Sequence, residues 1–125
     1  MSLDDKKILI CDDSIMTRKQ LKDIIKTLGG TPVFIEAKNG IEAVDAYKEH
    51  KPDLCFLDIV MPVMDGSNAL AAIKDFDENA RVVIVSSIGT QGTISKVLSN
   101  GALEFVQKPF MIDNIKEIVV KYLGE

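Results

Sequence analysis

The chain has 125 residues, of which 46% are hydrophobic and 27% are charged, a composition typical of globular proteins. This length suits one domain with a sizeable core and is short for two, so we expect a single domain over residues 1–125. Fifteen basic and nineteen acidic residues give a net charge of −4. No cluster of Lys or Arg could neutralise a row of phosphates, which argues against nucleic acid as a direct partner.

The sequence also argues against a membrane or secreted protein. No apolar run approaches the roughly 20 residues that a membrane helix needs. The first residues, MSLDDKKILI, lack the basic and long apolar regions of a secretory signal. We therefore expect a cytoplasmic protein.

Five short apolar runs recur along the chain, each bounded by charged residues or turn formers, as buried strands would be. The predicted strands are KILIC (7–11), PVFIEA (32–37), DLCFLD (53–58), RVVIVSS (81–87) and LEFVQ (103–107). The first, third and fourth runs are apolar nearly throughout, which favours central strands covered on both faces. The proline of the second run favours an edge strand.

Segments with helical spacing of apolar residues lie between these strands and after the last one. They follow Ser14, Asn39-Gly40, Asp65-Gly66 and Gln91-Gly92, and the last one ends the chain. Their apolar positions are Leu21, Ile24, Ile25 and Leu28; Ile41, Val44 and Tyr47; Leu70, Ile73 and Phe76; Ile94, Val97 and Leu98; and Ile115, Ile118, Val119, Tyr122 and Leu123. The alternation predicts a doubly wound, flavodoxin-like α/β fold, with a five-stranded parallel sheet and helices on both faces.

Cysteine usage is consistent with an intracellular protein. Cys11 and Cys55 each lie inside a strongly apolar run. In a chain without a secretory signal, such cysteines are usually reduced and packed in the core. We expect neither a disulfide nor a cysteine metal site.

Polar residues collect at the carboxyl ends of the predicted strands. These ends meet at one edge of a parallel sheet, where ligands of such folds bind. The residues are Asp12 and Asp13 after the first strand, Asp58 at the end of the third, Ser86 and Ser87 at the end of the fourth, and Lys108 after the fifth. We expect them to share one rim.

Three carboxylates in one crevice would form an oxygen-rich pocket suited to Mg²⁺. With a metal to screen charge, Asp58 could act as a nucleophile toward phosphorus, while the Ser86 hydroxyl and the Lys108 ammonium hold phosphoryl oxygens. A simpler interpretation stays open for each residue. Asp12 or Asp13 would then cap a helix, Ser86 would be an ordinary strand-end serine, and Lys108 a surface lysine.

Four motifs together give the chain a family resemblance. DDS at 12–14, LDIVMPVMDG at 57–66, VSS at 85–87 and KPF at 108–110 resemble the motifs of response-regulator receiver domains of two-component signalling, the CheY-like family. The resemblance covers essentially the whole chain. It implies strand order 2-1-3-4-5 and a signalling protein that takes a phosphoryl group from a histidine kinase or phosphotransfer protein. Such a receiver is not a conventional enzyme, although it catalyses its own phosphorylation and dephosphorylation.

The same resemblance assigns the site residues. Asp58 is the phospho-acceptor, and Mg²⁺ is bound by Asp12, Asp13, Asp58 and the backbone carbonyl of Val60. Lys108 contacts the phosphoryl group, and the family's geometry makes the Lys108-Pro109 peptide bond cis.

The resemblance also implies a switch. Ser86 is the switch hydroxyl and Phe105 the switch aromatic, in place of the more frequent threonine and tyrosine. Their inward movement would remodel a surface of the fourth helix, fifth strand and fifth helix, where an output protein or domain binds. Val60 and Ile88 flank the phosphoryl group and cannot orient water, so we expect a long-lived phosphorylated state.

Several features receive simpler interpretations. His50 is expected at the surface of a helix end, because the kinase supplies the phosphodonor histidine. GTQG at 89–92 lacks the lysine and hydroxyl of a nucleotide loop and is interpreted as a flexible connection. No output domain follows the last helix, which indicates a stand-alone regulator or a receiver taken from a longer protein.

Three other functions remain as alternatives. A flavodoxin-like electron carrier would share the fold, but Asp12 and Asp13 would repel a flavin phosphate. An aspartyl-phosphate phosphohydrolase would have its nucleophile after the first strand, whereas the best nucleophile here is Asp58. A pure interaction module would not need the complete set of acids.

Overall fold

The structure is a computed structural model that describes residues 2–124. Five strands alternate with five helices in the predicted order. They are β1 (Lys7–Cys11), α1 (Ile15–Lys26), β2 (Val33–Ala37), α2 (Gly40–His50), β3 (Leu54–Leu57), α3 (Gly66–Phe76), β4 (Val82–Ser86), α4 (Gln91–Ser99), β5 (Glu104–Gln107) and α5 (Ile112–Leu123). Four of the strands are slightly shorter than predicted, so Asp58 lies just beyond β3 rather than within it.

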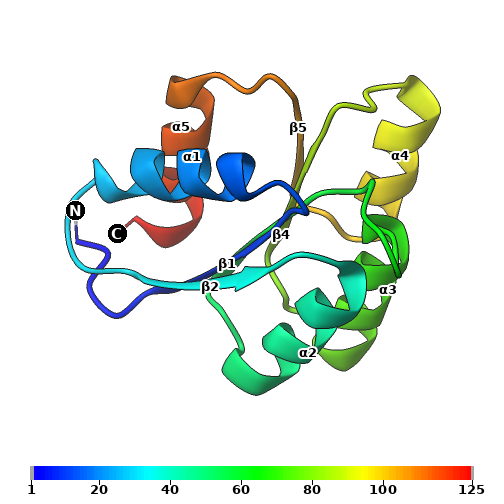
Figure 1. Ribbon diagram of the computed structural model, residues 1–125, viewed down its shortest axis with the longest axis horizontal. Helices are drawn as coiled ribbons and strands as arrows, with labels where there is room; N and C mark the ends of the chain where they lie inside the picture. Colours follow the sequence, from blue (N-terminus) through cyan, green and yellow to red (C-terminus); the bar gives the residue numbers. More distant parts are fainter. Residues whose placement is uncertain (1, 125) are drawn as a thin grey trace.

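All strands run parallel in the order β2-β1-β3-β4-β5, as expected. Helices α1 and α5 lie together on one face of the sheet, and α2 and α3 lie on the other (Figure 1). The doubly wound fold is therefore confirmed, with β2 at an edge and β1, β3 and β4 inside the sheet. Among the described residues, no helix has both the length and the apolar character to cross a membrane.

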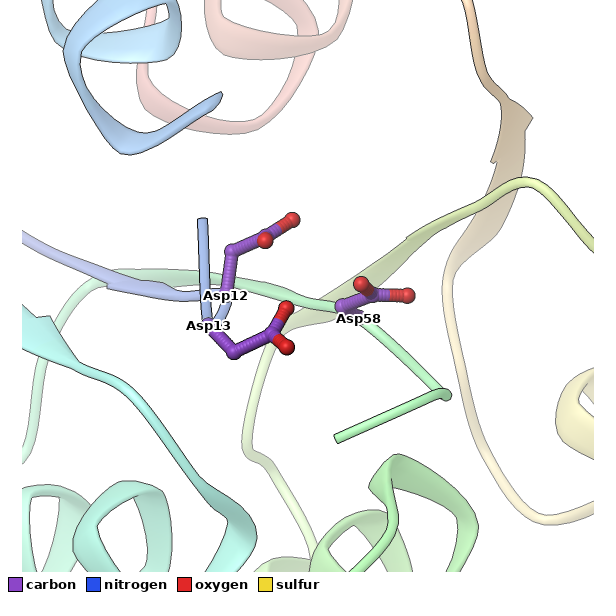
Figure 2. A group of neighbouring side chains, drawn as sticks. All are labelled: Asp12, Asp13 and Asp58. Carbon is purple, nitrogen blue, oxygen red and sulfur yellow. The ribbon is translucent and has the colours of Figure 1, made fainter. Parts of the chain in front are cut away.

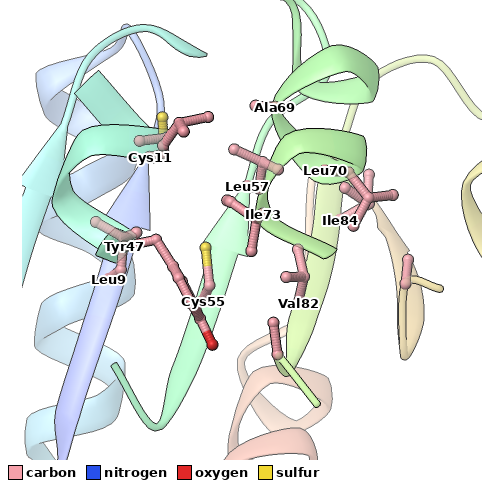
Figure 3. Close-up of a cluster of buried hydrophobic side chains, with 14 of the residues drawn as sticks. Leu9, Cys11, Tyr47, Cys55, Leu57, Ala69, Leu70, Ile73, Val82 and Ile84 are labelled. Carbon is pink, nitrogen blue, oxygen red and sulfur yellow. The ribbon is translucent and has the colours of Figure 1, made fainter. Parts of the chain in front are cut away.

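Alternating strand residues supply two apolar cores, one on each face of the sheet. Leu9 of β1 faces the α2/α3 core, whereas Ile8 and Ile10 face the α1/α5 core. Figure 3 shows the α2/α3 core, in which Cys11 and Cys55 pack as free thiols. Burial raises the pKa of the Cys11 thiol to about 12, so it is protonated at neutral pH. The expected reduced core cysteines are confirmed.

Side-chain caps fix where four of the helices begin. Ser14, Asn39 and Asp65 each accept a hydrogen bond from the backbone N–H three residues later. The helix predicted after Gln91-Gly92 begins at Gln91 itself, since Thr90 is its cap. Helix α5 has no side-chain cap.

Three residues in the predicted helical patterns are exposed. Ile41, Phe76 and Leu98 are exposed, because each falls at the margin of its helix's buried stripe. The ring of Phe76 contacts Tyr47 edge-on with centroids 6.3 Å apart. The apolar character of these three residues therefore helps to predict that a helix is present, but does not predict which of its faces is buried.

Candidate functional site

Three carboxylates meet at the carboxyl edge of the sheet. Asp12 and Asp13 follow β1, and Asp58 follows β3 (Figure 2). Carboxylate oxygens of the three residues lie within 4.8 Å of one another. Asp12 and Asp58 are only 2% and 6% exposed, whereas Asp13 is open to solvent. Buried carboxylates this close require compensation by positive charge.

Lys108 supplies that charge from the loop between β5 and α5. Its Nζ donates to Asp12 Oδ2 at 2.6 Å and to Asp58 Oδ2 at 3.1 Å. The ammonium thus bridges the two buried acids, and charge-assisted bonds of this length are strong. The Lys108-Pro109 peptide bond is cis, as expected.

Burial is the largest influence on ionisation in this site. It raises the pKa of Asp58, with Lys108 opposing the increase and Asp12 adding to it. Burial lowers the pKa of Lys108, but its bonds to Asp12 and Asp58 outweigh this and the pKa is raised. Because the folded protein holds a proton on Asp58 more readily than the unfolded chain, this carboxyl stabilises the metal-free fold at acid pH. That contribution is lost as the pH rises through the raised pKa.

The backbone fixes each buried acid separately. Asp12 Oδ1 accepts a hydrogen bond from the Ser14 N–H at 2.8 Å, and Asp58 Oδ1 accepts one from the Val60 N–H at 3.3 Å. The Asp58 N–H donates to the Cys11 carbonyl at 3.0 Å. Adjacent parallel strands therefore set the spacing between these acids, which is why strand-end residues distant in sequence converge.

The donor set fits a hard divalent cation. Its members are carboxylate oxygens, the ligand type that Mg²⁺ and Ca²⁺ prefer, and two of them are held rigidly by the bonds described above. The exposed Asp13 leaves the cluster open to water, which Mg²⁺ usually retains as ligand. The cluster therefore has the chemistry to hold a metal ion.

The family model of the response regulator receiver domain matches residues 8–120. The chain belongs to the response regulator receiver family. Chemotaxis protein CheY of Bacillus subtilis (strain 168) is 44% identical to this receiver over 118 residues, which span 94% of this chain and 98% of that protein. Sporulation initiation phosphotransferase F of the same strain is 39% identical over 119 residues, 95% and 94% of the two chains.

Solved receiver structures agree with this assignment. A chain of the CheX-CheY complex with BeF3 and Mg²⁺ from Borrelia burgdorferi has a TM-score of 0.88 and 37% identity, covering 96% of this chain and 90% of that one. The receiver is thus a CheY-like protein of two-component signalling, a family whose members are phosphorylated by kinases, and its acidic cluster fits the phospho-accepting site. These matches favour the receiver over the electron carrier and the phosphohydrolase.

The receiver's two predicted switch residues lie on neighbouring strands. Ser86 is fully buried at the end of β4, and its Oγ accepts from the Ile88 N–H at 3.2 Å. The Ser86 carbonyl accepts from the Lys108 N–H at 2.9 Å, so the backbone joins these two site residues. Phe105 pairs with Ile84 in the sheet and packs half-buried against the α2/α3 core, apart from the acidic cluster.

His50 lies at the opposite edge of the sheet. It is the last residue of α2, and its carbonyl accepts from Nζ of Lys7, the first residue of β1. Because the acidic cluster is at the other end of β1, His50 is far from the site. The expectation of a helix-end residue outside the site is confirmed.

The loop from β3 to α3 holds a strained residue of the receiver. Val63 is 75% exposed and adopts φ of 70°, a left-handed conformation that a β-branched side chain rarely takes. The Val63 side chain therefore contributes little packing energy to offset the free-energy cost of its left-handed backbone conformation. Nothing in the sequence around Val63 predicts this strain.

We expect Val63→Gly to stabilise the receiver by about 1 kcal/mol, because glycine adopts left-handed φ without penalty. Urea denaturation measures the change. The matched control is Val33→Gly, since Val33 is also exposed but lies in the extended backbone of β2, where glycine should destabilise. Equal destabilisation by both substitutions would contradict strain at Val63.

The sequence analysis did not identify one residue that lies beside the site. Arg18 of α1 donates from Nη1 to the Asp12 carbonyl at 2.6 Å and from Nε to Glu36 Oε1 at 2.9 Å. No motif marks it, because its partners come from the end of β1 and from β2. Only its place one turn after the Ser14 cap could have drawn attention to it.

Proposed function

We propose that this receiver accepts a phosphoryl group on Asp58 in a reaction that needs Mg²⁺. The observation that carries the proposal is the buried Asp58 carboxylate, held by Lys108 and grouped with two further acids. The metal ligands would be Asp12, Asp13, Asp58 and the backbone carbonyl of Val60. The donor is a histidine kinase or phosphotransfer protein.

In the proposed reaction an oxygen of Asp58 bonds to phosphorus as the P–N bond of a phosphohistidine breaks, and the donor imidazole leaves neutral after taking a proton from solvent. Lys108, already 3.1 Å from Asp58, turns its ammonium to the phosphoryl oxygens as their charge grows. Mg²⁺ would screen the repulsion between the acids and the incoming group. The chain thus catalyses its own phosphorylation.

We propose further that the Ser86 hydroxyl responds to phosphorylation of Asp58. Its Oγ, which now accepts from the Ile88 N–H, would donate to a phosphoryl oxygen instead. Phe105 packs beside β4 and would follow inward, which changes the surface of α4, β5 and α5. An output protein or domain that binds this surface would then distinguish the two states.

The test is phosphorylation with acetyl phosphate and Mg²⁺, followed by borohydride trapping and mass spectrometry. We expect one phosphoryl group per chain, located at Asp58, and none when EDTA replaces Mg²⁺. Asp58→Ala is the control and should take up none. Undiminished incorporation in Asp58→Ala, or in EDTA, would overturn the proposal.

A slow return to the unphosphorylated state is also expected. Val60 and Ile88 have exposed apolar side chains that can neither hydrogen-bond water nor position it. We expect Val60→Asn with Ile88→Glu to lose phosphate about tenfold faster at fixed Mg²⁺, which is less than a fully positioned general base contributes. The control pair is Val33→Asn with Val120→Glu, which changes exposed residues of β2 and α5. Equal decay in both double variants would show that lifetime is set elsewhere.

A further inference from the structure

Arg18 connects three parts of the fold beside the acidic cluster. From α1 it reaches the Asp12 carbonyl at the end of β1 and the Glu36 carboxylate in β2. Its side chain is only 14% exposed and its bond to the Asp12 carbonyl is partly buried, whereas the Glu36 carboxylate is open to solvent. We propose that Arg18 is a positioning residue for the metal site, which holds the Asp12-Asp13 peptide in place and is itself held by Glu36. This inference rests on the proposed function of the cluster.

The peptide that Arg18 holds determines where Asp13 lies. The Asp12 carbonyl belongs to the planar unit that joins Asp12 to Asp13, so a bond to its oxygen fixes the orientation of the whole unit. The Asp12 side chain has its own bonds to Ser14 and Lys108. Within residues 2–124, the exposed Asp13 carboxylate accepts no hydrogen bond, so only its backbone directs it toward the cluster. Arg18 therefore fixes one of the two peptide units that flank Asp13, and the Ser14 N–H bond to Asp12 Oδ1 holds the other.

The guanidinium suits this task because it donates in two fixed directions. Nη1 points to the carbonyl and Nε to Glu36 Oε1, and the Arg18 N–H bonds the Ser14 carbonyl in the first turn of α1. Glu36 is in turn fixed by Lys22, whose Nζ lies 2.9 Å from Oε2. A lysine at position 18 has one donor group and could not make both bonds in this geometry.

Charge and geometry predict opposite effects of Arg18 on cation binding. A positive charge near the cluster repels a divalent cation, so loss of charge alone would tighten binding. Loss of positioning would weaken binding, because Asp13 would no longer be held toward the other acids. The sign of the change therefore distinguishes the two roles.

The experiment is titration of the unphosphorylated protein with Mg²⁺ by calorimetry, with no phosphodonor present. We expect Arg18→Gln to weaken Mg²⁺ binding about tenfold, as the loss of groups that orient metal ligands does. Arg18→Lys should weaken it similarly despite keeping the charge. Lys22→Gln is the control, since it removes a cation from the same Glu36 without contact to Asp12, and should change affinity by about twofold or less.

The amide signals of Asp13 and Ser14 provide a second readout in metal-free protein. They should shift in Arg18→Gln and Arg18→Lys but stay unchanged in Lys22→Gln, and the remaining spectrum reports whether each variant is folded. Unchanged or tighter Mg²⁺ binding by folded Arg18→Gln, or full retention by Arg18→Lys, would overturn the positioning role. Failure of the parent protein to bind Mg²⁺ would instead overturn the proposed function of the cluster.

Discussion

Lys108→Met should slow phosphorylation of Asp58 by about 100-fold or more, the usual loss when a group that stabilises transition-state charge is removed. The same substitution should tighten Mg²⁺ binding, because the ammonium that bridges Asp12 and Asp58 competes with a cation for their oxygens. Calorimetry and acetyl phosphate labelling measure the two effects. Their opposite directions separate a role for Lys108 in the reaction from a role in assembling the metal site.

Lys108→Met should also destabilise the metal-free protein by about 2 kcal/mol at neutral pH. Breaking a buried ion pair costs more than this, but the Lys108 side chain is 22% exposed and Asp58 can take up a proton. The loss should shrink at acid pH and when Mg²⁺ is added. The control Lys121→Met removes an exposed lysine 3.5 Å from Glu104 and should change stability far less, because solvent screens this pair. Equal effects of the two substitutions would contradict a charge-balancing role for Lys108.

The sequence predicts the fold well because its short apolar runs and its segments of helical apolar spacing alternate and are separated by turn residues. Strands β1, β3 and β4 are apolar nearly throughout, as parallel strands covered on both faces of a sheet are. The acidic cluster could be predicted for the same reason, since parallel strands bring Asp12 and Asp58 to one edge. Lys108 was predicted at that edge, and the structure adds that it bridges both acids.

Other features depend on packing that no local pattern records. The bond from Arg18 to the Asp12 carbonyl requires α1 to lie across the end of β1 at one rotation, with Glu36 of β2 beside it. The φ of Val63 follows from how the loop must close between β3 and α3. The exposure of Ile41 follows from which face of α2 meets the sheet, since Ala43, Val44 and Tyr47 are the buried side chains of this helix. Spacing alone predicts none of these, because each is decided by elements distant in sequence.

Gly66→Ala should be among the most damaging small substitutions in this receiver. A Cβ built on Gly66, the first residue of α3, would lie 2.0 Å from the Asp58 carbonyl oxygen and 2.7 Å from Ile59 Cα. Both are backbone atoms and cannot rotate away, and the Gly66 N–H holds the close approach by donating to the Ile59 carbonyl at 2.7 Å. We expect a loss of roughly 3 kcal/mol in the free energy of unfolding, the upper part of the range for overpacking.

The clash should also impair metal binding and phosphorylation, because the Asp58 backbone must move away from Asp12 and Lys108 to make room for the added Cβ. Gly66→Ala should therefore bind Mg²⁺ more weakly and accept phosphate more slowly even under conditions where it is folded. Gly92→Ala is the matched control: a Cβ at Gly92 in α4 meets nothing within 4 Å, so alanine should stabilise the protein by roughly 0.5 kcal/mol through helix propensity. Urea denaturation and Mg²⁺ titration of both variants provide the test. A Gly66→Ala protein with parental stability and metal affinity would mean that the loop can yield without displacing Asp58.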